Sequence, residues 1–468
     1  MPEKATLLSV YGYLPQTNCG ECGEPNCMAF ASKLLERKAT PEDCPPLKKP
    51  KYKEQMAKLV ELIAPPIKEV KIGVGDRAVK IGGKEVMYRH ELTYHNPTAI
   101  AIDVSDTMDD GKIVERCKAI ETFTIVRIGE PLKLNMVAVR CSSKDPDRFS
   151  YVTSLISRSC SLPLILCSFD PKNLKAALEK GQVANKRPLL YAVTEDNWRE
   201  VSELAKQYDC PVAVFAPNNL TLLKSLIKTL QAIGIHDIVI DLGSYTEGKL
   251  LKDSINNLVM IRRTAIQRGD KDLGYPIMAI PAIAWMGEKQ DPITASYKEA
   301  YIASLFMNRY ADLIIMHTLE IWALLPVITL RQNIYTDPRK PVSVESGLRT
   351  IGKPDEKSPV LLTTNFSLTY YTVANDIESA GINCYLLVLN TEGLAVEVSV
   401  AGGQFNPSNV KDLFSSSGIE KTVKHKKLII PGMAARLKGE IEDSTNWEVI
   451  VGPRDSSQIK SFLAKYWG

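Results

Sequence analysis

The stretch PVAVFAPNNLTLLKSLIKTLQAIGIHDIVIDLG (211–243) contains one complete strand–helix–strand unit. Its ends, PVAVFAP (211–217) and DIVIDLG (237–243), are short apolar runs rich in valine and isoleucine, which is typical of strands buried on both faces of a sheet. Between them, LTLLKSLIKTLQAIG (220–234) repeats leucine and isoleucine at helical spacing. We therefore expect two parallel strands joined by a helix.

Six more apolar runs of the same kind surround this unit, and polar segments compatible with helices separate them. They are TAIAIDV (98–104), MVAVRC (136–141), LPLILCS (162–168), PLLYAVT (188–194), YPIMAIPA (275–282) and DLIIMHT (312–318). Eight such strands alternating with helices predict a (β/α)8 barrel over residues 61–330. An open, doubly wound sheet is the alternative, because the pattern does not show whether the sheet closes.

The chain after the barrel changes character twice. Residues 331–358 are polar and rich in proline and glycine, which predicts a linker. Four shorter apolar runs then alternate with helical segments and predict a small, open α/β domain over 359–468. They are PVLLTTN (359–365), CYLLVLN (384–390), KLIIPGM (427–433) and WEVIVGP (447–453). Small and hydroxyl-bearing residues crowd the carboxyl ends of these runs, where such sheets bind their ligands.

Four cysteines, Cys19, Cys22, Cys27 and Cys44, lie close together near the start of the chain, which predicts a separate metal module over residues 1–60. Zinc sites usually pair their ligands as two C-x2-C knuckles, whereas here three cysteines form one tight loop and the fourth follows a helical segment. This spacing favours a [4Fe–4S] cluster, with a structural zinc as the alternative. Gly20 and Gly23 leave backbone N–H groups free to donate to cluster sulfurs.

Composition restricts the partners and the compartment. The 468 residues are 45% hydrophobic and 24% charged, which predicts a globular protein of two or three domains. Lysine and arginine (58) nearly balance aspartate and glutamate (54), so we expect no nucleic-acid partner. The start MPEKATLLSV lacks the pattern of a signal peptide. The apolar stretch 313–330 contains His317 and Glu320, which favours a buried strand followed by a helix over a membrane span, and we expect a cytoplasmic protein.

These parts, in this order, resemble the large subunit of the corrinoid iron–sulfur protein, which is the gamma subunit of acetyl-CoA decarbonylase/synthase in methanogenic archaea. The resemblance covers the whole chain. Besides the eight strands and Cys44, it rests on CGECGEPNCMAFA (19–31), LLTTNFSLTYY (361–371), NTEGLAV (390–396), IIPGMAARLKGEIE (429–442) and VIVGPRDSS (449–457). It implies a Rossmann-like, corrinoid-binding C-terminal domain beside the barrel and the iron–sulfur module.

The activity that the resemblance implies is that of a methyl carrier and methyl-tetrahydropterin:corrinoid protein Co-methyltransferase within a multi-subunit complex. Its cobalt, alternating between Co(I) and methyl-Co(III), would take a methyl group from methyl-tetrahydrosarcinapterin or methyl-tetrahydrofolate and exchange it with the nickel site of acetyl-CoA synthase. The cluster on Cys19, Cys22, Cys27 and Cys44 would return Co(II) to Co(I). Implied partners are a smaller homologous barrel subunit, acetyl-CoA synthase and CO dehydrogenase subunits, and a low-potential electron donor such as ferredoxin.

The corrinoid contacts are expected in the loops that follow the four C-terminal strands. We predict Thr363, Thr369, Gly393, Leu394, Ala395, Val396, Gly432, Met433 and Ser456. Thr369 has an alternative role, because it could cap the helix that begins there.

Histidine usage indicates how the cobalt would be held. No D-x-H-x-x-G motif is present, and His425, the one histidine in the C-terminal domain, precedes a strand and is expected to be solvated. This absence fits the base-off corrinoid, with no histidine of the protein on the cobalt, that the resemblance implies, and such a cobalt is more easily reduced to Co(I).

The barrel offers polar residues at the carboxyl ends of its strands. Asp103, Asp106, Asn218, Asn219 and Asp241 could contact a pterin or simply cap loops. A different class of protein is also compatible with the sequence: a barrel enzyme acting on a pterin or small carbonyl substrate, with a structural zinc and a nucleotide-binding C-terminal domain.

Overall fold

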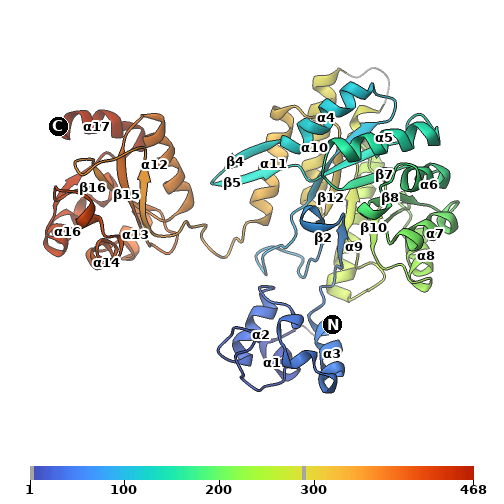
Figure 1. Cartoon of the computed structure of the whole chain (residues 1–468), viewed down its shortest axis with the longest axis horizontal. Helices are drawn as coiled ribbons and strands as arrows, with labels where there is room; N and C mark the ends of the chain where they lie inside the picture. Colours follow the sequence, from blue (N-terminus) through green and yellow to red (C-terminus); the bar gives the residue numbers. More distant parts are fainter. Residues whose placement is uncertain (1–4, 287–290, 468) are drawn as a thin grey trace. The chain divides into compact units, whose positions relative to one another are not determined.

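A computed structural model describes residues 5–286 and 291–467 of the chain (Figure 1). The chain forms two compact units, the first holding residues 5–124 and 133–335 and the second residues 125–132 and 336–467. No helix among the described residues is long and apolar enough to cross a membrane.

The N-terminal segment folds as a small helical cluster. Its elements are α1 (Leu7–Gly12), α2 (Cys27–Leu35), the 3-10 turns η1 (Pro41–Asp43), η2 (Pro46–Lys48) and η3 (Pro50–Tyr52), and α3 (Lys53–Ile63). The core contains Phe30, Leu47 and Leu59, all buried, with two of the cysteines, Cys27 and Cys44, packed among them.

The eight predicted strands are all present, and the sheet closes. They are β3 (Ala99–Ser105), β6 (Met136–Arg140), β7 (Leu164–Cys167), β8 (Leu189–Val193), β9 (Val212–Phe215), β10 (Ile238–Asp241), β11 (Ile277–Ala279) and β12 (Leu313–Met316). All neighbours pair in parallel, and β12 pairs with β3 to complete the barrel. The (β/α)8 prediction is confirmed, and the open-sheet alternative is wrong for this part of the chain.

A helix follows each strand and lies outside the barrel (Figure 1). These helices are α4 (Asp110–Thr122), α5 (Pro146–Ser159), α6 (Pro171–Glu179), α7 (Trp198–Tyr208), α8 (Leu220–Ala232), α9 (Gly248–Arg268), α10 (Pro292–Asn308) and α11 (Ile321–Tyr335). Several begin at an N-cap side chain that accepts a backbone hydrogen bond, as Asp109 does for α4 and Asn219 for α8. β12 and α11 confirm the strand and helix predicted for 313–330.

Alternation along the strands decides which side chains fill the barrel. The interior at its lower levels is apolar, with Ala99 and Ala101 of β3 and Leu313 of β12 pointing inward. Continuing the alternation to the carboxyl ends brings polar side chains inward, Asp103 on β3, Arg140 on β6 and Asp241 on β10 among them. At this end the barrel therefore has a layer of polar side chains, which we call the polar chamber, above an apolar core.

Several short elements are not among those predicted from the sequence. They are the antiparallel pairs β1 (Glu69–Ile72) with β2 (Val79–Gly82) and β4 (Thr124–Arg127) with β5 (Glu130–Lys133), and the 3-10 turns η4 (Gly75–Arg77), η5 (Ala184–Lys186) and η6 (Pro281–Trp285). In β4 no residue is fully buried, so no apolar alternation marks it.

The C-terminal domain contains a five-stranded sheet in the order β13-β15-β14-β16-β17. Its elements are β13 (Gly347–Ile351), β14 (Val360–Thr364), α12 (Ser367–Ser379), β15 (Cys384–Leu389), α13 (Val396–Gly402), α14 (Pro407–Ser417), α15 (Ile419–Thr422), β16 (Lys427–Ile430), η7 (Gly432–Leu437), α16 (Lys438–Thr445), β17 (Glu448–Val451), η8 (Ser456–Gln458) and α17 (Ile459–Tyr466). The four predicted strands are present and parallel.

Strand β13 is the one difference within this sheet. It lies in the segment 331–358, which the sequence presents as a linker, and it pairs antiparallel with β15 at the sheet edge. Only Ile351 of its five residues is buried, so the strand has no apolar run to reveal it.

Two hydrophobic cores sandwich the sheet. One contains Leu362 with residues of α14 and α16, and the other contains Leu361 with residues of α12 and α17. The chain passes from β14 to β15 on one side and then returns to place β16 on the other side of β14. The carboxyl ends of β14 and β16 therefore flank the topological switch point, where open α/β sheets bind their ligands.

Candidate functional site

The first three cysteines lie on a loop that leads into α2. Gly20 and Gly23 both adopt positive φ (74° and 82°), and the N–H of Gly23 donates to the carbonyl of Gly20 at 2.9 Å, which closes a tight turn around Cys22. Cys27 is the first residue of α2, and its own N–H donates to Asn18 Oδ1 at 2.9 Å. A thiolate at a helix N-terminus is favoured by the helix dipole, which suits a metal ligand.

The fourth cysteine approaches this loop from the other side of the small core. Cys44 directly follows η1, where Thr40 and Asp43 form reciprocal capping hydrogen bonds. Burial raises the pKa of its thiol, and the nearness of Cys22, Cys27 and Cys19 raises it further. Cys44 therefore lies near the other three cysteines, as a shared site requires.

The spacing of the four thiols bears on the type of metal. Four sulfurs around a single zinc ion lie about 3.8 Å apart, given a Zn–S bond of about 2.3 Å in a tetrahedron. Four thiols suit either a single zinc ion or a [4Fe–4S] cluster, and the loop of three cysteines followed by a fourth after a helix is the observation that favours the cluster.

A cleft of about 280 Å³ opens at the switch point of the C-terminal sheet. The ends of β14, β16 and β17 form its floor, and the first turns of α12 and α17 form one wall. Its lining is mainly apolar, with hydroxyl groups from Thr363, Thr369, Thr372 and Ser456, and Arg454 as the one charged side chain among the described lining residues.

Two hydroxyl groups at the end of β14 are buried without a partner. Thr363 is 1% exposed and Thr364 is fully buried, and neither hydroxyl has a hydrogen-bond partner among the described residues. An unpaired buried hydroxyl costs free energy, so a donor at the floor of a cleft suits hydrogen bonding to a ligand. Thr363 lines the cleft and was expected from the sequence, whereas Thr364 was not.

Five of the nine predicted contact residues line this cleft: Thr363, Thr369, Val396, Met433 and Ser456. Thr369 does not cap a helix, because α12 begins at Ser367 with Phe366 as its N-cap, so the capping alternative is wrong. Ser456 donates a hydrogen bond to Asp376 of α12, which ties the fourth loop to that helix.

The other four predicted residues shape the loops at the same end of the sheet. Gly393 has φ of +75°, and a Cβ there would lie 2.8 Å from Pro341 Cβ. Leu394 and Ala395 lead into α13, with Ala395 at its N-cap. Gly432 lies so close to the next loop that a Cβ would approach the Gly452 carbonyl oxygen to 2.8 Å, so glycine is required there by backbone packing.

Asn365 is a structural residue of this site that the sequence prediction missed. Its Oδ1 accepts hydrogen bonds from Thr391 N (2.9 Å), Thr391 Oγ1 (3.0 Å) and Gly393 N (3.0 Å). It therefore fixes the loop after β15 against the end of β14. An asparagine directly after a buried strand is the only sequence signal that could have pointed to it.

His425 lies away from the cleft and is not simply solvated, which corrects the expectation. It precedes β16, at the amino end of the sheet, where Nε2 lies 2.9 Å from the Ser358 carbonyl oxygen. Its ring also contacts Trp467 (4.8 Å between centroids) and Trp447 (6.2 Å). No histidine is found among the described residues that line the cleft.

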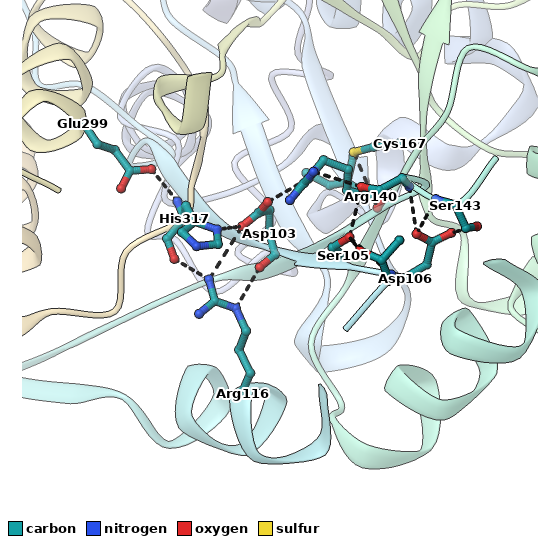
Figure 2. Close-up of polar contacts among 12 residues, drawn as sticks. Asp103, Ser105, Asp106, Arg116, Arg140, Ser143, Cys167, Glu299 and His317 are labelled. Carbon is teal, nitrogen blue, oxygen red and sulfur yellow. Dashed lines mark hydrogen bonds and ion pairs between the residues drawn. The ribbon is translucent and has the colours of Figure 1, made fainter. Parts of the chain in front are cut away.

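The mouth of the barrel holds a polar network centred on Asp103 (Figure 2). Its carboxylate pairs with Nδ1 of His317 and, at 3.0 Å, with Nε of Arg140, and Arg116 lies at 3.6 Å. Burial opposes ionisation, but these partners hold the pKa of Asp103 below its ordinary value. Glu299 accepts from the backbone N–H of His317, and from Thr318 N at 2.9 Å, which fixes the loop after β12.

The second buried carboxylate of the mouth is Asp241. It accepts hydrogen bonds from the Tyr191 hydroxyl (2.9 Å) and from Gly243 N (2.8 Å). Burial raises its pKa to about 6 in spite of these two bonds. The Tyr191 ring meets Phe169 and Phe215 at centroid distances of 5.7 and 6.1 Å, so this part of the mouth combines a carboxylate with an aromatic cluster.

The remaining polar residues expected here organise loops. Asp106 accepts from Ser142 N (2.8 Å) and Ser143 N (2.9 Å). Asn219 caps α8, and Asn218, with φ of 47°, bonds to Leu250 and Asn257. Loop capping therefore accounts for these three, and Asp103 and Asp241 are the two that belong to the polar chamber.

The closed barrel, the open C-terminal sheet and the four-cysteine segment together define an α/β protein. Residues 14–46 match the family model described as "Putative Fe-S cluster", and this match supports an iron–sulfur cofactor. Residues 69–463 match the family model "CO dehydrogenase/acetyl-CoA synthase delta subunit".

Relatives extend over almost the entire chain. The chain is 50% identical to acetyl-CoA decarbonylase/synthase complex subunit gamma 2 of Methanosarcina thermophila, covering 98% of both chains. It is 52% identical to the gamma subunit of Archaeoglobus fulgidus, again over 98% of both. The chain therefore belongs to the family of acetyl-CoA decarbonylase/synthase gamma subunits.

Among solved structures, dihydropteroate synthase from Thermus thermophilus overlaps 57% of this chain and 99% of its own length, with 14% identity and a TM-score of 0.39. A likeness of this size says nothing of what this chain binds.

Proposed function

We propose that this chain is a corrinoid iron–sulfur methyl carrier that works as a subunit of an acetyl-CoA decarbonylase/synthase complex. It would exchange a methyl group between a methyl-tetrahydropterin and the nickel site of acetyl-CoA synthase, in either direction. The observation that carries the proposal is the cleft at the switch point of the C-terminal sheet, with the buried, unpaired hydroxyl of Thr363 at its floor, in a chain that also holds four converging thiols.

The cleft residues suit a corrinoid. When bound, the corrinoid would supply a cobalt nucleophile that accepts and releases a methyl group. Thr363 would donate its hydroxyl to the cofactor, and Thr369, Val396, Met433 and Ser456 would line the contact. The described lining residues would hold the corrinoid through apolar contacts and hydroxyl groups.

The cysteine module would hold a [4Fe–4S] cluster through Cys19, Cys22, Cys27 and Cys44. Its role would be to pass single electrons of low potential, received from a donor such as ferredoxin, and so to rescue oxidised cobalt. The buried positions of Cys27 and Cys44 and the more exposed positions of Cys19 and Cys22 leave one side of the site close to solvent, where a donor protein can approach.

The barrel mouth would take the pterin. A tetrahydropterin presents a flat ring with N–H donors, and Asp241 beside the Phe169–Tyr191–Phe215 cluster offers an acceptor next to aromatic surface. A smaller homologous barrel subunit, acetyl-CoA synthase and CO dehydrogenase are the proposed protein partners. The proposed division is a cluster module over 1–60, a barrel that extends to the end of α11, and a C-terminal domain that begins before β13, because this strand belongs to its sheet.

The proposed division of labour is tested by Cys22→Ala in the cofactor-loaded chain. Methyl transfer from a methyl-tetrahydropterin should proceed at the normal rate after chemical reduction of the cobalt, because the cluster takes no part in it. Reactivation by a protein electron donor should be lost. If the variant fails even with chemically reduced cobalt, the module has a structural role and the assignment is wrong.

A matched control is Cys210→Ala. Cys210 is a buried cysteine of the barrel, outside the four-cysteine module. Both activities should survive in this variant. Assays with tetrahydrosarcinapterin and tetrahydrofolate derivatives, with and without the smaller subunit, identify the donor and show whether this chain suffices for the transfer.

A further inference from the structure

A second cavity, of about 320 Å³, lies at the opposite end of the barrel from Asp103. Its walls come from the segment that follows β2, from α9, and from the ends of α10 and α11, which lead to the amino ends of strands or out of the barrel. Nothing in the proposed methyl transfer uses this end of the barrel. Its volume is at the small end of ligand pockets, which measure about 300–1,000 Å³.

The walls of this cavity are strongly cationic. Lys84, Arg89, Arg262 and Arg309 line it together with His90, and no aspartate or glutamate is found among the described lining residues. Asp312, just behind the wall, accepts from Arg262 Nη2 at 2.6 Å and lies 3.6 Å from Lys84 Nζ. One carboxylate thus faces two buried cations, and a positive charge is left without compensation.

The electrostatic imbalance is visible at Lys84. Its Nζ donates to the carbonyl oxygens of His95 (2.6 Å) and Asn96 (2.7 Å), and its side chain is buried. Burial lowers the pKa of Lys84 to about 7, although Asp312 acts in the opposite direction. A bound anion would stabilise the charged form of Lys84.

Arg262 supplies unused hydrogen-bond donors at the same wall. The side chain is only 1% exposed, and its Nη2 donates to Tyr310 O and to Asp312. Its Nε and Nη1 have no hydrogen-bond partner among the described residues. The Nε–H and the Nη1–H groups lie on different edges of the guanidinium, so each can donate singly to an anion oxygen, and leaving them unpaired in a buried place is costly.

Aromatic rings complete the cavity. Tyr88 and His90 stack at the rim with centroids 5.7 Å apart and planes 7° apart. Tyr94 and Tyr335 meet edge to face at 6.0 Å, and Tyr310 lies against the Arg262 guanidinium. Tyr88 and His90 are exposed, so a flat ring can stack on their free faces.

We propose that this cavity is a binding site for a planar-ring anion of the nucleoside monophosphate type. Its phosphate oxygens would accept from Arg262 inside the cavity and from Arg89 and Arg309 at the rim. Its ring would stack beside Tyr88 and His90. The site is separate from the corrinoid cleft and from the polar mouth of the barrel, and it does not depend on the proposed methyl transfer.

Calorimetric titration of the full-length chain with adenosine monophosphate, adenosine and inorganic phosphate tests the proposal. The monophosphate should bind with one-to-one stoichiometry and at least tenfold more tightly than either fragment, because only it engages both the cations and the rings. Absence of binding overturns the site. Equal affinity for adenosine overturns the anion requirement, and equal affinity for phosphate overturns the ring requirement.

Variants place the binding in this cavity. Arg309→Gln and Arg89→Gln change exposed side chains and should each weaken binding of the monophosphate about fivefold, as expected for one rim ion pair. Arg262→Lys keeps the charge beside Asp312 but removes the unpaired Nε–H and Nη1–H donors, and should weaken binding more than tenfold. The matched control is Arg158→Gln, an exposed arginine on α5, which should leave the affinity unchanged.

A far-ultraviolet circular dichroism spectrum shows whether the Arg262→Lys variant is folded. If this variant does not fold, Arg309→Gln and Arg89→Gln still test the site. Unchanged affinity in both rim variants would place the monophosphate elsewhere and overturn the proposal.

Discussion

Replacement of Thr363 by valine should have opposite effects on the empty and the loaded protein. Valine has nearly the same shape as threonine, but it removes a hydroxyl that is 1% exposed and has no partner among the described residues. In the cofactor-free chain, removing an unsatisfied buried hydroxyl should stabilise the C-terminal domain by about 1 kcal/mol, within the ~1–3 kcal/mol that such groups cost. Its melting temperature should rise by a few degrees.

The loaded protein should respond in the other direction. If Thr363 donates to the corrinoid, the variant loses one hydrogen bond worth about 0.5–1.5 kcal/mol, and cobamide affinity should fall about two- to tenfold. Differential scanning calorimetry of the cofactor-free chain and anaerobic cobamide titration measure the two effects. Thr445→Val is the isosteric control, because its hydroxyl already donates to Ile441 O at 2.7 Å, so it should lose slight stability and no affinity.

A Thr363→Val chain that is both less stable without cofactor and unchanged in cobamide affinity would refute the reasoning. That outcome would mean that the hydroxyl is satisfied within the protein and that the cleft floor does not contact the cofactor.

Two further predictions concern the barrel mouth and the C-terminal loops. Burial raises the pKa of Asp241 from its ordinary value of 3.8 to about 6. Between these two pH values the folded barrel holds a proton that the unfolded chain has released. The free energy of unfolding therefore falls as the pH rises from about 4 to 6. Asp241→Asn should therefore raise the free energy of unfolding relative to the parent by up to about 3 kcal/mol at pH 8, and by much less at pH 4. Thermal scans across this pH range measure the difference. An equal gain at both pH values would contradict the buried carboxylate as its cause. Gly432→Ala places a Cβ 2.8 Å from the Gly452 carbonyl oxygen and 2.9 Å from Arg454 N, so it should destabilise the C-terminal domain by about 1–3 kcal/mol in denaturant titrations, whereas Gly439→Ala, which meets nothing within 4 Å, should not.

The strand pattern of the chain could be predicted because most strands are buried on both faces. All seven residues of β3 are buried, so an unbroken apolar run is the direct signature of its place in the sheet. β13 and β4 could not be predicted, because they lie partly in solvent and carry polar residues instead of an apolar run. Closure of the barrel depends on the pairing of β12 with β3, which lie far apart in the chain, and no local pattern encodes that pairing.

Some residues of the candidate sites could also be predicted from the sequence, and others could not. The four cysteines were found because their spacing is local and cysteine is rare in such clusters. Thr363 and Met433 were found because ligands of open sheets lie at strand ends. Asn365, Thr364 and the unpaired donors of Arg262 emerged only from the structure, because a residue's missing or shared hydrogen bonds are set by the packing of distant segments.

The central claim is that one chain holds a corrinoid in its C-terminal cleft and a [4Fe–4S] cluster on its four N-terminal cysteines. An absorption spectrum of the anaerobically purified chain, combined with metal analysis, tests it most directly. We predict a cobamide band, a broad iron–sulfur charge-transfer shoulder, and about one cobalt and four iron atoms per chain, as these two cofactors require. A colourless protein with one zinc per chain and no cobalt would contradict the account and favour a zinc-containing barrel enzyme.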